Sequence, residues 1–155
     1  MLVEDDAVVR EVIDRLLVGF GARVTAVAGA DEALDALPRA RADVLVSDID
    51  MPGEDGYALI RKIRALPADR GGETPAVGLT GWNTAEHEGH MLRAGYQSCL
   101  AKPVDAQRLV GVVAALVALT ARRSTGAALV CRAWTALEAF RGAAGGARRP
   151  REDTT

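Results

Sequence analysis

The segment Val44-Leu45-Val46-Ser47-Asp48-Ile49-Asp50-Met51-Pro52-Gly53-Glu54-Asp55-Gly56-Tyr57 combines an apolar run, a carboxylate and a turn. The apolar run at 44–46 is typical of a buried strand, and it ends in the charge of Asp48. Pro52, Gly53 and Gly56 break regular structure, so we expect Asp48 at the C-terminal edge of that strand. Ligands bind at this edge of open α/β sheets. A lone aspartate there is more often a solvated strand end, so its role depends on the residues around it.

The rest of the chain alternates strand-like and helix-like segments around this one. Helical spacing of apolar residues follows the predicted N-cap Asp6 as far as Gly19, and a second helix is predicted from its N-cap Asp31 to Pro38. The predicted strands are 1–3, 23–27, 44–47, 76–80 and 98–101, and the later helices are 59–66, 84–94 and, after the cap Asp105, 106–121. Such alternation predicts a doubly wound, parallel α/β sheet of five strands in the flavodoxin-like order 2-1-3-4-5.

Length and composition predict one domain with a short appendage. We expect the domain at 1–121 and a tail at 122–155, with a helical candidate at 127–140 and disorder beyond it. The tail is too short for a DNA-binding output domain, and the acidic balance of 1–121 does not favour nucleic acid as a partner. With no apolar run near the roughly 20 residues that span a bilayer, and with Cys99 and Cys131 far apart, we expect a cytoplasmic protein with reduced thiols and no membrane segment.

The predicted strand order brings several polar side chains to one crevice. They come from the ends of the first, third, fourth and fifth strands: Glu4, Asp5, Asp48, Thr80 and Lys102. Each pair of carboxylates about 4 Å apart costs on the order of 4 kcal/mol at an effective dielectric constant near 20, so a cation is expected among them. Oxygen ligands without histidine or cysteine suit Mg²⁺, or Mn²⁺. A metal, a lysine and a nucleophilic carboxylate together suit the binding of a phosphoryl group.

Four segments in order resemble the receiver domain of response regulators in two-component signalling. They are Leu2-Val3-Glu4-Asp5-Asp6, the stretch from Asp48 to Gly56, Leu79-Thr80-Gly81 and Ala101-Lys102-Pro103. The segments at 59–67 and 94–97 look most like receivers attached to hybrid histidine kinases. The resemblance covers residues 1 to about 121.

This resemblance implies a function and a role for each site residue. Asp48 would accept a phosphoryl group from a phosphohistidine on a histidine kinase or phosphotransfer protein. Mg²⁺ would bind to Asp5, Asp48 and the backbone carbonyl of Asp50, with Glu4 acting through water. Thr80 would hydrogen-bond the phosphoryl group and Lys102 would pair with it. The chain would catalyse only its own phosphorylation and slow dephosphorylation. The family often has a cis peptide at the position of Lys102-Pro103.

The sequence also departs from the family pattern. Cys99 occupies the position that often carries a switch aromatic, and Asp50 and Trp82 stand where side chains border the water route to the phosphoryl group. An alternative is therefore a receiver-like module that docks or dimerises without phosphorylation. Its candidate surface is formed by the helix at 84–94, the strand at 98–101 and the helix at 106–121, where Leu109, Val110 and Leu119 are left to cover a second face.

A third hypothesis is a phosphatase of the haloacid dehalogenase type, which also uses an aspartyl nucleophile with Mg²⁺. The pair Asp48 and Asp50 resembles its motif. That family has the motif on its first strand and Thr or Val two residues after the second aspartate, whereas here the motif is on the third predicted strand and that position is Pro52. The phosphatase is accordingly the least favoured of the three.

Overall fold

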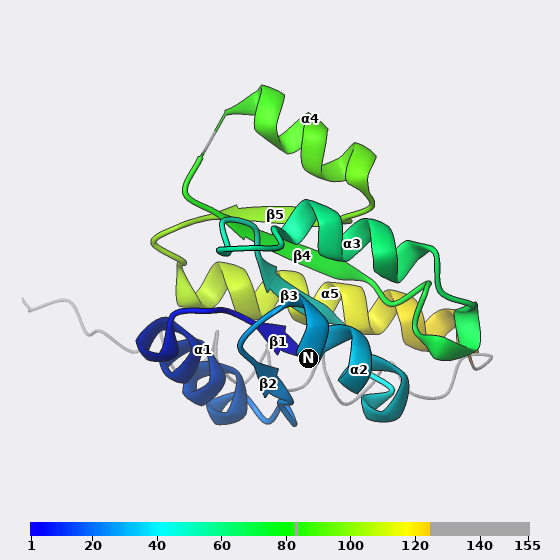
Figure 1. Ribbon diagram of the computed structural model, residues 1–155. Coiled ribbons are helices and arrows are strands. Elements are labelled where there is room, and N and C mark those ends of the chain that lie inside the picture. The colour runs from blue at the N-terminus through cyan, green and yellow to red at the C-terminus, as the bar shows by residue number, and fades with distance from the viewer. Residues whose placement is uncertain (83, 125–155) are drawn as a thin grey trace, which may run out of the picture. The chain divides into compact units, whose positions relative to one another are not determined.

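The computed structural model describes residues 1–82 and 84–124 (Figure 1). Within them, five strands form one parallel sheet in the predicted order β2-β1-β3-β4-β5. The strands are β1 (Leu2–Val3), β2 (Ala26–Val27), β3 (Leu45–Asp48), β4 (Ala76–Thr80) and β5 (Ser98–Ala101). The described helices include none that combines the length and apolar character needed to cross a membrane.

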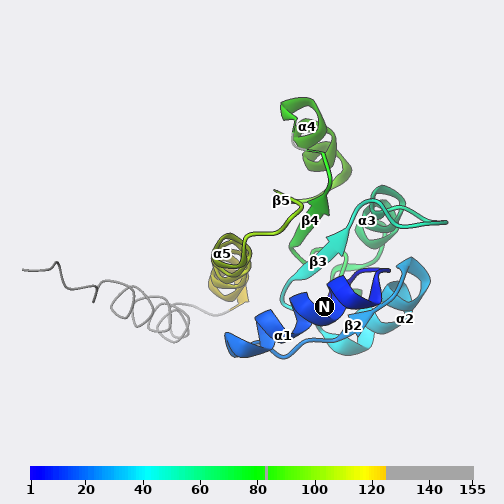
Figure 2. The ribbon, with the colours of Figure 1, turned by 90° about the vertical axis from the view of Figure 1, so that its left-hand side faces the viewer.

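Helices cover both faces of the sheet, as crossovers between parallel strands require (Figure 2). One face packs against α1 (Ala7–Gly19) and α5 (Ala106–Ser124), and the other against α2 (Ala30–Ala40), α3 (Gly56–Arg64) and the single buried side chain of α4 (Ala85–Ala94), Met91. A short 3-10 helix, η1 (Ala68–Arg70), lies between α3 and β4. Two apolar layers therefore hold the sheet in place between them.

Two helix starts show how local sequence sets the element boundaries. Asp6 caps α1, and its Oδ1 accepts the backbone N–H groups of Val8 and Val9 at 2.8 and 3.0 Å. Asp105 caps α5 in the same way, accepting the N–H of Arg108 at 2.7 Å. The predictions for both caps are confirmed.

The boundaries predicted for the second helix were wrong at both ends. Gly29 is the N-cap of α2, and its carbonyl accepts the N–H of Ala33. Asp31 therefore lies inside the first turn, where its negative charge interacts favourably with the positive end of the helix dipole. Pro38 does not end the helix, because it lacks only its own N–H and lies within the last turn. The helix ends at Arg41, which has a left-handed backbone with φ of 44°.

Two further predictions need correction. The strand predicted at 23–27 is shortened to Ala26–Val27, because β1 offers only Leu2 and Val3 as pairing partners. Leu109 was assigned to a second surface of the last helix, but it is fully buried under the sheet together with Leu116.

The chain divides into a compact unit at Met1–Val117 and a second unit that begins at Ala118. The helix predicted at 127–140, and Cys131 within it, lie outside the described residues. The proposed boundary at 121 stays a prediction.

Candidate functional site

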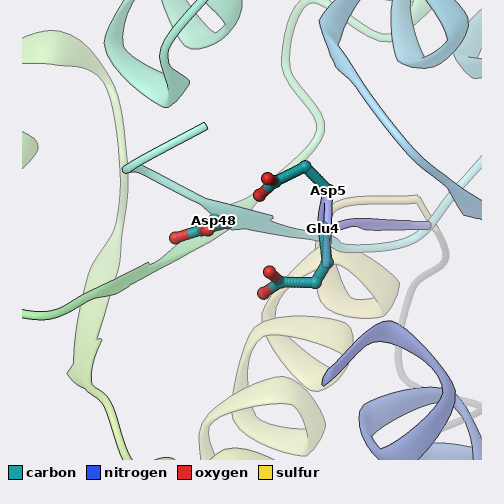
Figure 3. A group of neighbouring side chains, drawn as sticks. All are labelled: Glu4, Asp5 and Asp48. Atoms are coloured by element: carbon teal, nitrogen blue, oxygen red, sulfur yellow. The ribbon is translucent and has the colours of Figure 1, made fainter. Parts of the chain in front are cut away.

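Three carboxylates meet where β1 and β3 end (Figure 3). Glu4 and Asp5 directly follow β1, and Asp48 is the last residue of β3. Because Val3 lies opposite Ser47 in the parallel pairing, the next residues of both strands emerge side by side. Carboxylate oxygens of the three residues lie within 4.8 Å of one another. Glu4 and Asp48 are buried, with 1% and 3% of their surfaces exposed.

Lys102 brings a positive charge to this group. Its Nζ lies 2.8 Å from Oδ2 of Asp48 and 3.0 Å from Oε2 of Glu4. The backbone places it there, since its N–H donates to the carbonyl of Thr80 at 2.7 Å. The following peptide bond to Pro103 is cis, as the resemblance implied. Lys102 thus bridges two of the three carboxylates.

Burial and neighbouring charges shift the pKa values of Glu4 and Lys102. Burial raises the pKa of Glu4, against the opposing effect of its hydrogen bond to Lys102. Burial alone would lower the pKa of Lys102, but its hydrogen bonds and charge attraction to Asp48 and Glu4 outweigh that effect, so its pKa is raised. Lys102 is therefore positively charged at neutral pH.

The loop after β4 lies against the loop after β3. Thr80 is buried at the end of β4, and its Oγ1 accepts the backbone N–H of Trp82 at 3.1 Å. The N–H of Gly81 donates to Oδ2 of Asp50 at 3.3 Å, and the N–H of Asp50 donates to Oδ1 of Asp48 at 3.2 Å. A chain of hydrogen bonds therefore connects the carboxylate group to the loop that carries Thr80.

Trp82 and Cys99, two of the positions that depart from the family pattern, have different environments. The Trp82 side chain is largely exposed and stacks on the ring of His87, with the ring centroids 6.0 Å apart. Cys99 is partly buried in β5 and packs against the apolar layer that contains α3, and burial raises the pKa of its thiol. Tyr96 does not take its place, because its hydroxyl is buried and donates to the carbonyl of Gly56 at 2.8 Å.

Sequence reasoning missed one residue of this site, Arg10. Its Nη1 donates to the backbone carbonyls of Glu4 and Asp5, at 2.6 and 3.0 Å, and so fixes the loop that carries both carboxylates. The available signal was its position in the first turns of a helix that begins directly after the acidic run.

The cluster of three carboxylates, Glu4, Asp5 and Asp48, has the chemistry of a divalent-cation site. All candidate donors are oxygens, which hard cations such as Mg²⁺ prefer. When ionised, the three carboxylates carry a charge of −3, and Lys102 returns only +1. A further positive charge would remove the remaining repulsion, so this group can bind a metal ion.

Comparison with known proteins identifies the family of this chain. A family model described as the response regulator receiver domain matches residues 1–114. An uncharacterised 14.6 kDa protein of Leptolyngbya boryana is 39% identical over 113 residues, which are 73% of this chain and 85% of that protein. The sensory/regulatory protein RpfC of Xanthomonas campestris pv. campestris is 36% identical over 131 residues, which are 84% of this chain but only 18% of RpfC.

Solved structures of receiver domains and response regulators are similar to this chain as well. The receiver domain of the sensor histidine kinase PA1611 from Pseudomonas aeruginosa is 34% identical, with a TM-score of 0.67, over 75% of this chain and 93% of that one, and its active-site cleft holds a coordinated magnesium ion. A response regulator of Chloroflexus aurantiacus is 32% identical, with a TM-score of 0.69, over 76% of this chain and 94% of that one. The chain belongs to the response regulator receiver domain family of two-component systems.

Proposed function

We propose that this protein is a phosphoacceptor in a two-component phosphorelay, taking a phosphoryl group from a phosphohistidine onto Asp48. The observation that carries the proposal is the contact of Lys102 with Asp48 at 2.8 Å, beside two further carboxylates at the ends of β1 and β3. The donor is a histidine kinase or phosphotransfer protein. We place the exchange in the cytoplasm, where we expect the protein from its sequence.

The chain's own residues account for the transfer chemistry. An Oδ atom of the ionised Asp48 carboxylate attacks phosphorus and forms the O–P bond. The P–N bond of the phosphohistidine breaks, its electron pair stays on the imidazole nitrogen, and that nitrogen takes a proton from solvent water. We assign the metal to Asp5, Asp48 and the carbonyl of Asp50, with Glu4 acting through water. Bound there, the cation neutralises phosphoryl oxygens. Lys102 then exchanges its contact with the Asp48 carboxylate for one with the phosphoryl group.

The conformational response begins at Thr80 in this proposal. Its Oγ1 now accepts a hydrogen bond from the backbone of Trp82, and its hydroxyl proton is available to a phosphoryl oxygen. Turning toward that oxygen shifts the population of the loop that leads into α4. With Cys99 in β5, no aromatic ring at that position follows the motion of Thr80.

Phosphorylation by a small-molecule donor tests the proposal directly. Incubation with acetyl phosphate and Mg²⁺ should add one phosphoryl group to the wild type, seen as the corresponding increase in intact mass. Asp48→Asn should stay unlabelled, whereas Asp69→Asn, an equal change of charge at an exposed position of η1, should label like the wild type. Chelation of Mg²⁺ should abolish labelling. Labelling that persists in Asp48→Asn would refute the assignment.

A second candidate function is signalling without phosphorylation, which Cys99 in the place of the aromatic favours. It predicts that Asp48→Ala binds its partner as the wild type does, and a strict dependence of binding on phosphorylation would eliminate it. The haloacid dehalogenase-type phosphatase gains no support, since the motif lies on β3 and the relatives are receivers. Multiple turnover on a phosphoester would be needed to revive it.

A further inference from the structure

An open groove of about 450 Å³ lies between α3 and α4, the two helices on the side of β4 and β5 in Figure 1. It shares no residue with the carboxylate group at the ends of β1 and β3. The residues that line it, three from the start and middle of the α3 region and three from the end of α4, are Asp55, Tyr57, Arg61, His90, Arg93 and Ala94. The function proposed above gives this groove no role.

Two arginine side chains in the lining of the groove carry positive charge that is not neutralised by an ion pair among the described residues. Arg61 and Arg93 are exposed and, within the described part of the chain, form no ion pair. Neighbouring cations differ, because Lys62 pairs with Glu54 at 2.7 Å. The one acid in the lining, Asp55, accepts the N–H of Ala58 at 2.7 Å as the cap of α3. Two arginines from different helices thus line one shared space, whose lining includes a single acid.

The walls of the groove are fixed at both ends of α3. At its start, the buried hydroxyl of Tyr96 donates to the carbonyl of Gly56 at 2.8 Å. At its end, Nε and Nη2 of Arg64 donate to the carbonyl of Gly95, the C-cap of α4, at 3.0 and 2.8 Å. Both contacts join α3 to the turn that follows α4. The two walls therefore keep their spacing without a ligand, which lowers the cost of binding one.

We propose that this groove binds a small organic phosphate. The phosphate lies between the guanidinium groups of Arg61 and Arg93, whose planar donors match phosphate oxygens two at a time. The organic part lies against the ring of Tyr57 and the methyl group of Ala94. A groove of this size falls in the range of small-molecule sites, and a bare phosphate would leave most of it to water.

The shared chemistry is the phosphate dianion, and two sources of it are distinguished by experiment. Adenosine monophosphate and inorganic phosphate are titrated separately into the full-length protein, and backbone amide shifts are followed by NMR. Mg²⁺ is removed with a chelator, so that phosphorylation of Asp48 plays no part and the two proposals fail independently. Saturable shifts are expected in α3 and α4, with the nucleotide binding at least tenfold more tightly than inorganic phosphate.

Charge-neutral variants identify the groove as the site. Arg61→Gln and Arg93→Gln should each weaken nucleotide binding about tenfold or more, the effect of losing a charged hydrogen bond. Arg70→Gln, the same change at an exposed position of η1, should bind like the wild type. The arginines are exposed, so unchanged thermal unfolding is expected and would confirm that the variants fold.

Three outcomes would overturn the proposal. The first is the absence of saturable binding of adenosine monophosphate. The second is binding that Arg61→Gln and Arg93→Gln weaken no more than Arg70→Gln does. The third is equal affinity for inorganic phosphate and for the nucleotide. The contact of the organic part with Tyr57 would then add nothing to the affinity.

Discussion

At the scale of single residues, Lys102 offsets the unfavourable free energy of burying two carboxylates. It contacts Asp48 and Glu4, both of which are almost completely buried. Replacing it in Lys102→Met leaves two buried carboxylates without their cation, so we expect a loss of about 2–3 kcal/mol in the free energy of unfolding when Mg²⁺ is chelated. Urea denaturation measures this loss.

Adding Mg²⁺ provides the matching control. If a cation binds to the same carboxylates, it should stabilise Lys102→Met by more than it stabilises the wild type, because it then replaces the missing charge. An unfolding free energy of Lys102→Met equal to that of the wild type in chelator would contradict the electrostatic role given to this lysine.

Tyr96 makes a second residue-scale prediction, about alkaline pH. Burial raises the pKa of its phenol in the folded state above the ordinary value of about 10. A raised folded-state pKa contributes stability that is fully present below the unfolded pKa and is lost as the pH rises above it. Between pH 10 and 11 the wild type should therefore lose about 1 kcal/mol more than Tyr96→Phe does.

Denaturation at pH 8, 10 and 11 checks this difference. At pH 8 the Tyr96→Phe variant should be less stable by about 1 kcal/mol, because it lacks the hydrogen bond to Gly56. The gap between the two proteins should then narrow as the pH rises, because only the wild type contains the phenol of Tyr96, whose pKa is raised in the folded state. Tyr57 is present in both proteins, so its contribution cancels in the comparison. A gap of constant size would show that the phenol of Tyr96 ionises as readily in the folded state.

At the scale of elements, Gly56 brings the start of α3 against the backbone at the end of β3. A Cβ at this position would lie 2.5 Å from the carbonyl oxygen of Asp48 and 2.8 Å from Cα of Ile49. These are backbone atoms that cannot turn aside, so Gly56→Ala should lower the free energy of unfolding by about 2–3 kcal/mol. It should also reduce labelling of Asp48, because the backbone of this proposed phosphoacceptor is displaced.

Gly111 is the matched control, since it lies inside α5 with no atom within 4 Å of the position of its Cβ. Gly111→Ala should stabilise the protein by about 0.5–1 kcal/mol through helix propensity. Thermal or urea unfolding of the two variants should therefore shift in opposite directions, and equal effects would contradict the packing argument.

The elements also show what sequence patterns can and cannot predict. The apolar runs of β3 and β4 were recognised because they are buried on both faces, and four motifs in order placed the carboxylates and Lys102 together. Helix ends were less predictable, since the start of α2 depends on a hydrogen bond to Gly29 rather than on the nearest acid. The burial of Leu109 depends on the rotation of α5, which several apolar residues leave open.

At the scale of the whole molecule, some features come only from the fold. The groove between α3 and α4 was not predicted, because Arg61 and Arg93 lie far apart in sequence and belong to no shared motif. Most contacts of Arg10 and Arg64 are made to backbone carbonyls, which leave no pattern in residue types. A homodimer through α4, β5 and α5 stays a prediction.

Metal binding provides a prediction for the molecule as a whole. Mg²⁺ should raise the unfolding temperature, by an amount equivalent to about 2.7 kcal/mol at a concentration of one hundred times its Kd. Asp5→Asn should largely remove this gain, because it takes away one ligand and part of the repulsion that the cation relieves. Differential scanning calorimetry with chelator and with Mg²⁺ measures both. A gain of the same size in Asp5→Asn would exclude Asp5 as a ligand.

Arg64 has a consequence for how the protein opens. Its guanidinium also donates to the carbonyls of Gly72 and Thr74 at 2.9 and 2.8 Å and to the side-chain oxygen of Gln97, which itself accepts the N–H of Ala76 at 2.7 Å. We therefore expect the end of α3, the approach to β4 and the start of β5 to separate together. In hydrogen exchange, the amides of this corner should exchange as one cooperative unit, and a single side chain sets how often that unit opens.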